Sequence, residues 1–99
     1  MNHQVTAKIL FLVDVPAPKL KGVVSGYSPH HKFEDLEYLV SGRHEYADQN
    51  THYPGDTLIA RIGFASWEFF GQKIKVGDKF EIRELDRKVG VGTVISIDV

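Results

Sequence analysis

Apolar side chains recur at every second position in several short segments of the chain, which is the pattern of strands with one buried face. The clearest of these segments are 5–13, 57–64, 79–83 and 89–99. Residues 23–24 are predicted to form a further short strand, and turn sequences such as Pro54-Gly55-Asp56 separate the segments. Six or seven short strands joined by turns predict an all-β barrel or sandwich, in one domain over residues 1–99.

The C-terminal segment carries the most regular alternation. Gly90 and Gly92 lie opposite its apolar face, where they would let another backbone approach closely or let a barrel strand bend. The residues predicted to share the apolar face are Val89, Val91, Thr93, Ile95, Ile97 and Val99.

The segment around Leu36 is ambiguous. Phe33, Leu36 and Val40 recur at helical spacing, and Gly42 is suited to ending a helix. Leu36, Tyr38 and Val40 also alternate, as in a strand. Periodicity alone does not choose between helix and strand here.

Composition narrows the functional classes. Twelve basic and thirteen acidic residues give a formal net charge of −1, so no overall field attracts the chain to nucleic acid or to an anionic membrane. The chain has no cysteine, which excludes disulfides, thiolate nucleophiles and zinc–thiolate sites and fits a reducing cytoplasm. The apolar run 9–13 is too short to span a bilayer or to form a signal-peptide core. We therefore expect a cytoplasmic protein with no membrane partner.

No combination of residues typical of catalysis stands out. The serines lie in no nucleophile elbow, and no cofactor-binding motif occurs, so we expect no catalytic residue and no cofactor. The spacing of His30, His31, His44 and His52 does not match that of a zinc protease. These histidines are predicted to lie on the surface or in turns, and no metal site is expected.

Four motifs then occur in a recognisable order. They are V-T-A-K-I-L-F-L at 5–12, G-Y-x-P at 26–29, P-G-D at 54–56, and F-E-I-R-E at 80–84 followed by V-G-V-G-T-V at 89–94. Together they resemble the C-terminal β-barrel domain of translation elongation factor Tu. The resemblance implies a closed antiparallel Greek-key barrel of about six strands, and it favours a strand over a helix at 33–40.

The differences from that family bear on function. The phosphate-binding sequence G-x-x-x-x-G-K-[ST] is absent, so the chain has no site for GTP. The resemblance implies contact with aminoacyl-tRNA, but the family's glycine pair after I-R-E is Leu85-Asp86 here, which adds bulk and negative charge. We therefore expect a stand-alone, non-catalytic module that binds a protein partner linked to translation. One concrete version is a mimic of the elongation factor, such as an immunity protein against a toxin.

Two segments are predicted to form the docking surface. The loop 65–76 is rich in large aromatic residues, which often anchor interfaces, although they could instead plug the end of the barrel. The turn that joins the last two strands is predicted to contribute the rest. The predicted partner-binding residues are Trp67, Phe69, Phe70, Leu85, Asp86, Arg87 and Lys88.

The alternative function is an RNA-binding accessory of the translation apparatus. Lys73, Arg87 and Lys88 would contact tRNA phosphates if the fold gathered them at one end of the barrel. Acidic residues such as Asp78 and Glu84 lie among them, as on an ordinary solvated face. No pattern in the sequence identifies the partner or the oligomeric state.

Overall fold

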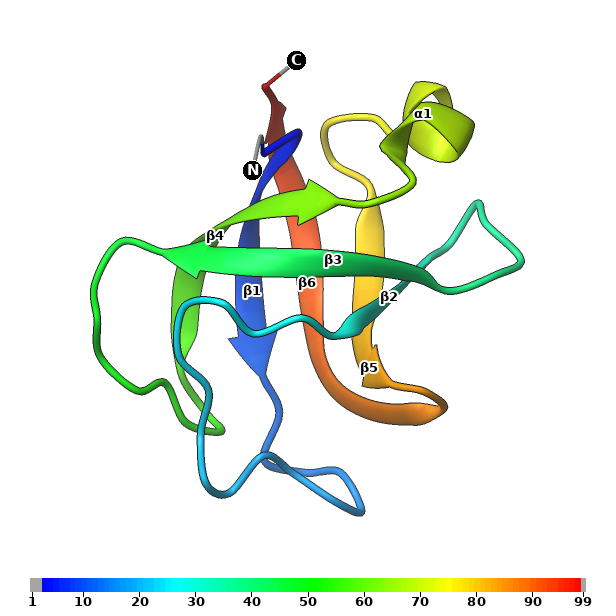
Figure 1. Ribbon diagram of the computed structural model, residues 1–99. Helices are drawn as coiled ribbons and strands as arrows, with labels where there is room; N and C mark the ends of the chain where they lie inside the picture. Colours follow the sequence, from blue (N-terminus) through cyan, green and yellow to red (C-terminus); the bar gives the residue numbers. More distant parts are fainter. Residues whose placement is uncertain (1–2, 99) are drawn as a thin grey trace.

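The computed structural model describes residues 3–98, which form six antiparallel strands and one short helical segment (Figure 1). The helix α1 (Trp67–Phe70) continues into a 3-10 turn, Gly71–Lys73. No helix in this part of the chain is long and apolar enough to cross a membrane. The strands are β1 (Val5–Phe11), β2 (His30–Phe33), β3 (Val40–Tyr46), β4 (Thr57–Phe64), β5 (Lys79–Glu84) and β6 (Arg87–Ile97).

The strands close into a barrel in the order β1-β4-β3-β2-β5-β6, and β6 pairs back onto β1. β2, β3 and β4 follow one another as neighbours, whereas the long connection 12–29 crosses one end of the barrel and leaves β1 beside β4 (Figure 1). This is a Greek-key connection. The predicted all-β, closed, antiparallel Greek-key barrel of about six strands is confirmed.

Alternation of side chains along the strands builds the interior. In β1, Val5, Ala7, Ile9 and Phe11 are buried, whereas Lys8 is exposed. The inward residues of β4 and β5 join the same core. They include Ala60, Ile62, Phe64, Phe80 and Ile82.

The segment around Leu36 is neither a helix nor a continuous strand. β2 ends at Phe33, β3 begins at Val40, and the residues between them form the turn that joins the two strands. Leu36 is buried, and its backbone N–H donates to the carbonyl of Phe33 at 3.2 Å. The helical spacing therefore reflects three inward side chains around a turn, and the expectation of a strand across 33–40 is wrong.

The predicted continuous face of β6 is interrupted twice. Val89 has no partner in the ladder with β5, and Ile95 has none in the ladder with β1, so each is an extra residue at an irregularity. As a result Val89 and Val94 are buried, whereas Ile95 is exposed. Val91 and Thr93 lie on the outer face, and Val99 lies outside the described residues. A strict period of two could not reveal these shifts.

Candidate functional site

The aromatic residues of α1 close one end of the barrel, which we call the helix end. Phe70 is fully buried, with its ring 5.4 Å from that of Phe64 and 6.3 Å from that of Phe33. Trp67 stacks on Phe64 at 6.0 Å. Gly71 makes this possible, because a Cβ at that position would lie 2.3 Å from the indole ring. The prediction that Phe70 anchors a partner is therefore wrong, because the folded chain already uses that side chain to fill its interior.

Phe69 differs from its neighbours. Phe69 is 71% exposed, whereas Trp67 is partly buried and packs against the core. Lys73 is exposed at the same end of the barrel. Of the three predicted aromatic anchors, Phe69 is thus the one that is mostly accessible.

The other predicted docking residues lie at the opposite end of the barrel (Figure 1). Leu85 and Asp86 form the two-residue turn between β5 and β6, and β5 separates this turn from the helix end. A strand of that length spans about 20 Å. The predicted surface is therefore divided between two ends, and the predicted RNA cluster does not form, because Lys73 is remote from Arg87 and Lys88.

Leu85 has an unusual backbone conformation. Its φ is 60°, and it is the one non-glycine residue between 3 and 98 with a positive φ. A left-handed conformation costs an L-residue about 1–2 kcal/mol, and glycine is the usual residue at such a turn position. The Leu85 side chain is nevertheless 67% exposed. The fold thus holds a large apolar side chain in water at a position where glycine would be less strained.

Other exposed apolar residues accompany Leu85. Leu20 is 75% exposed, and it follows Lys19, whose Nζ lies 2.7 Å from Glu84 beside Leu85. Val13 is 62% exposed, and a Cβ added at Gly55 would lie 3.8 Å from it. We call the barrel end formed by the connections 12–29 and 47–56 and the turn 85–86 the loop end. Its exposed apolar residues include Val13, Leu20, Tyr53 and Leu85.

Glu84 binds three side chains at the loop end. The Tyr27 hydroxyl donates to its Oε2 at 2.7 Å, Lys19 pairs with the same oxygen, and Arg87 pairs with Oε1. Burial on its own would raise the pKa of Glu84, but the hydrogen bonds from Lys19 and Tyr27 lower it overall. Three donors therefore hold one carboxylate directly beside the strained turn.

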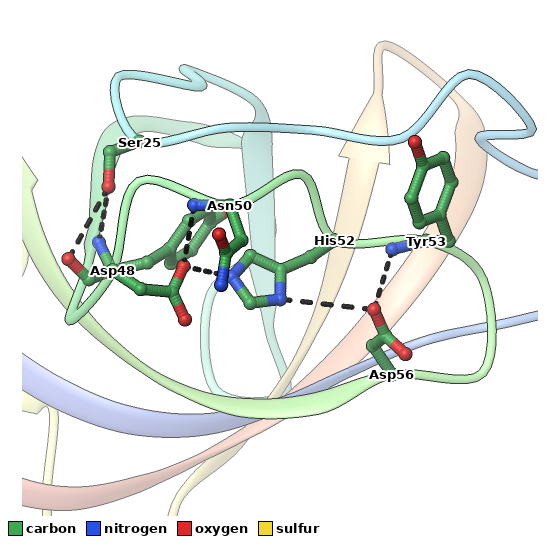
Figure 2. A network of polar contacts seen from close by, with 7 residues as sticks. Ser25, Asp48, Asn50, His52, Tyr53 and Asp56 are labelled. Carbon is green, nitrogen blue, oxygen red and sulfur yellow. Dashed lines mark hydrogen bonds and ion pairs between the residues drawn. The ribbon is translucent and has the colours of Figure 1, made fainter.

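A second network orders the connection 47–56 (Figure 2). His52 lies between two carboxylates, with Nε2 at 2.9 Å from Asp48 Oδ1 and Nδ1 at 3.8 Å from Asp56 Oδ2. The backbone N–H groups of Asn50 and Tyr53 donate to these same oxygens. The hydrogen bond from the Asn50 N–H is the main cause that lowers the pKa of Asp48, and the hydrogen bond from His52 lowers it further.

The two long connections of the loop end are also joined to each other. Val23 forms an isolated bridge with His52, which replaces the short strand predicted at 23–24. At the end of β3, the Tyr46 backbone N–H donates to Ser25 Oγ at 2.8 Å. These bonds connect the loops at this end to each other and to the barrel.

The barrel interior contains a chain of hydrogen-bonded polar side chains that was not predicted from the sequence. His31 and His44 are both fully buried, and their Nε2 atoms lie 2.8 Å apart. The expectation that these two histidines lie on the surface or in turns is wrong. Gly42 provides the space, because a Cβ there would lie 2.9 Å from the His31 ring. The available signal was the alternation of Val40, Gly42, His44 and Tyr46, which puts all four on one face.

The partners of the two histidines define where the protons are. His31 Nδ1 lies 3.2 Å from the Val40 carbonyl, which can only accept, so Nδ1 carries the proton and Nε2 accepts. His44 Nε2 must then donate to His31, and His44 Nδ1 accepts from the Tyr46 hydroxyl at 3.0 Å. Burial lowers the pKa of His31 to about 4. Burial is also the main cause that lowers the pKa of His44 well below its ordinary value, and the nearby His31 lowers it further. Both rings are therefore neutral at physiological pH.

The comparisons with known proteins add no assignment. The chain matches no protein-family model, and a search of curated proteins finds no significant relative. Within residues 3–98, no three histidine, aspartate or glutamate side chains are grouped so that they could hold a metal ion. The resemblance to the elongation factor domain therefore stays a prediction based on the four motifs.

Proposed function

We propose that this chain is a non-catalytic protein-binding module that meets its partner through the loop end. The observation that carries the proposal is Leu85, a mostly exposed apolar side chain at φ 60°. Strained, exposed residues are typical of functional positions, because nothing in the folded chain alone favours them. Leu20 and Val13 extend the same surface.

The surroundings of Leu85 suit a docking surface. The ion pairs of Glu84 with Lys19 and Arg87 lie next to the exposed apolar residues, so polar groups border an apolar centre. The link to translation and action as a mimic of the elongation factor rest on the sequence resemblance, whereas the proposed cytoplasmic location rests on composition. In this proposal the residues Leu85, Asp86, Arg87 and Lys88 keep their predicted role, whereas Trp67 and Phe70 stabilise the fold.

Binding of tRNA is the weaker alternative. Arg87 pairs with Glu84, and Lys88 Nζ lies 3.3 Å from Glu81, so both cations already have carboxylate partners. Lys73 lies at the other end of the barrel. Salt-sensitive tRNA binding weakened by Arg87→Ala would support this alternative.

The proposal is tested by immobilising the barrel, passing a cell lysate over it and treating half of the sample with nuclease. We expect a specific protein to remain after nuclease and to be lost from the double variant Leu20→Ser/Leu85→Gly. The control is Phe69→Ser, which removes a similarly exposed side chain at the helix end and should keep the partner. Retention of tRNA alone, lost with nuclease, would contradict the proposal.

A further inference from the structure

A groove of about 850 Å³ runs along the outer wall of the barrel, over β6 and between β1 and β5. Val91 and Thr93 of β6 line it, together with Leu10 of β1. Leu10 pairs directly with Val91 across the ladder, so the two make a continuous apolar floor. None of these three residues belongs to the loop end, and the groove shares only Lys88 with the docking residues proposed above.

The glycines of β6 let neighbouring groups approach this strand closely. A Cβ at Gly92 would lie 2.3 Å from the Phe80 ring, and one at Gly90 would lie 2.9 Å from the Leu10 carbonyl oxygen. Because neither residue has a side chain, the Phe80 ring and the β1 backbone lie close against β6 at these positions.

Positive charge borders the groove. Thr93 pairs with Lys8 on one side and with Lys79 on the other, so two lysines face each other across the floor. Two strand spacings separate their Cα atoms by about 10 Å. Neither lysine forms an ion pair with any residue from 3 to 98. The cations that line the groove are Lys8, Lys32, Lys79, Arg83 and Lys88.

The charge of the groove is opposite to that of the whole chain. Two carboxylates, Glu34 and Glu81, accompany the five cations, so the groove carries a net +3. The complete chain has a net charge of −1. The positive charge is therefore concentrated on one wall of the barrel, and the remaining surface is acidic. Such a distribution attracts an acidic partner specifically to this wall.

We propose that this groove binds an acidic amphipathic helix of another protein. The apolar stripe of the helix lies on Leu10 and Val91, and acidic side chains on its two edges reach Lys8 and Lys79. A helix with its side chains is about 10–12 Å wide, which matches the separation of the two lysines. Apolar contact supplies the affinity and the lysines set the orientation.

A nucleic acid fits the groove less well. Single-stranded nucleic acid needs exposed aromatic rings for stacking, but the aromatic residue at this groove, Phe80, is buried and packs inward. The Glu81 carboxylate, held 2.6 Å from Arg83 and 3.3 Å from Lys88, lies directly beside Val91. A continuous polyanion would have to cross this carboxylate, whereas a peptide can place its acidic residues at the edges only.

The test is a titration of the ¹⁵N-labelled chain with a synthetic peptide of about 18 residues, long enough for partial helicity. The peptide carries leucine at helical spacing with glutamate on both edges. A scrambled peptide of the same composition and a short single-stranded RNA are titrated in parallel. With the designed peptide alone, we expect amide shifts confined to the residues that line the groove, on β1, β5 and β6 and at the adjoining positions of β2 and β4.

The double variant Lys8→Glu/Lys79→Glu should bind the designed peptide about tenfold or more weakly. The amide spectrum of the variant verifies that the variant is folded. The charge-matched control, Lys73→Glu/Lys75→Glu, alters two exposed lysines at the helix end and should change the affinity less than about twofold. Equal binding of the scrambled peptide, tighter binding of the RNA, or the absence of shifts in the groove would each overturn the proposal. None of these outcomes bears on the loop end, so the two proposals fail separately.

Discussion

The two ends of the barrel use most of their large apolar residues differently, although Phe69 at the helix end is as exposed as Leu85 at the loop end. At the helix end, Phe70 is buried against the core and Trp67 is stacked on Phe64. At the loop end, Leu20 and Leu85 project into water although polar networks hold the surrounding backbone firmly. The difference shows that an aromatic-rich loop is not by itself an interface. Exposed apolar side chains on an ordered, strained turn are the stronger indication of binding.

Truncating Phe70, which fills the helix end of the barrel, should have the largest effect on stability. Phe70→Ala should lower the free energy of unfolding by about 3–5 kcal/mol, because it leaves a cavity beside Phe33 and Phe64. Denaturant unfolding, followed by circular dichroism, measures this loss. Phe69→Ala, at the exposed neighbouring position, should change stability by no more than about 0.5 kcal/mol. Equal effects of the two substitutions would contradict the assignment of Phe70 to the core.

Acid should destabilise the barrel interior through the buried histidine pair. The unfolded histidine titrates near pH 6.5 and buried His31 near 4, so between these values the unfolded state binds more protons. The free energy of unfolding should therefore fall as the pH is lowered from 6.5 to 4, by about 3 kcal/mol for His31 alone. Urea unfolding at several pH values, followed by fluorescence of the single tryptophan, measures this change.

The matched variant for this measurement is His31→Leu/His44→Leu. Replacing both rings removes the groups that gain protons on unfolding, so the stability should depend less steeply on pH. An unchanged slope in this variant would assign the acid sensitivity to other groups.

A substitution at Gly71 should displace the Trp67 ring from the core while Trp67 itself is kept. Gly71→Ala places a Cβ 2.3 Å from the indole ring, so Trp67 must swing outward. We expect a loss of about 1–3 kcal/mol in stability and a red shift of the fluorescence emission. Gln72→Ala, at the exposed next residue, serves as the control and should show neither effect.

The smallest expected effect on stability is that of a substitution at Leu85, and its sign distinguishes the loop end from the helix end. Leu85→Gly relieves the left-handed strain and removes no buried contact, so thermal unfolding should show unchanged stability or a gain of up to about 1 kcal/mol. Val76→Gly, at an exposed position without a positive φ, should instead lose up to about 1 kcal/mol. A clear loss from Leu85→Gly would mean that this side chain stabilises the fold.

Strand alternation and turn residues are local signals, and they were sufficient to predict an all-β barrel or sandwich. The closed Greek-key form, which the structure has, was implied by the resemblance to the elongation factor domain. It could not show that 33–40 is a turn with Leu36 buried, because a turn with inward residues has the same spacing as a helix. The two irregularities in β6 depend on pairing with both neighbours, which no single-strand pattern records.

The candidate sites were harder to predict because they depend on which segments meet. Leu85 and Trp67 are close in sequence but lie at opposite ends of the barrel, since β5 runs between them. The interior pair of His31 and His44 comes from different strands, and its burial depends on the space left by Gly42. The strain at Leu85 is a backbone property, and its sequence signal was a leucine where the family that the motifs resemble has glycine.

The most direct test of the central claim is hydrogen–deuterium exchange of the chain, alone and bound to the partner retained from lysate. Binding through the loop end predicts slower exchange at 19–27, 47–56 and 84–88, with unchanged exchange at 67–73. Protection confined to 67–73 would mean that the helix end is the interface, and it would contradict the proposed role of Leu85.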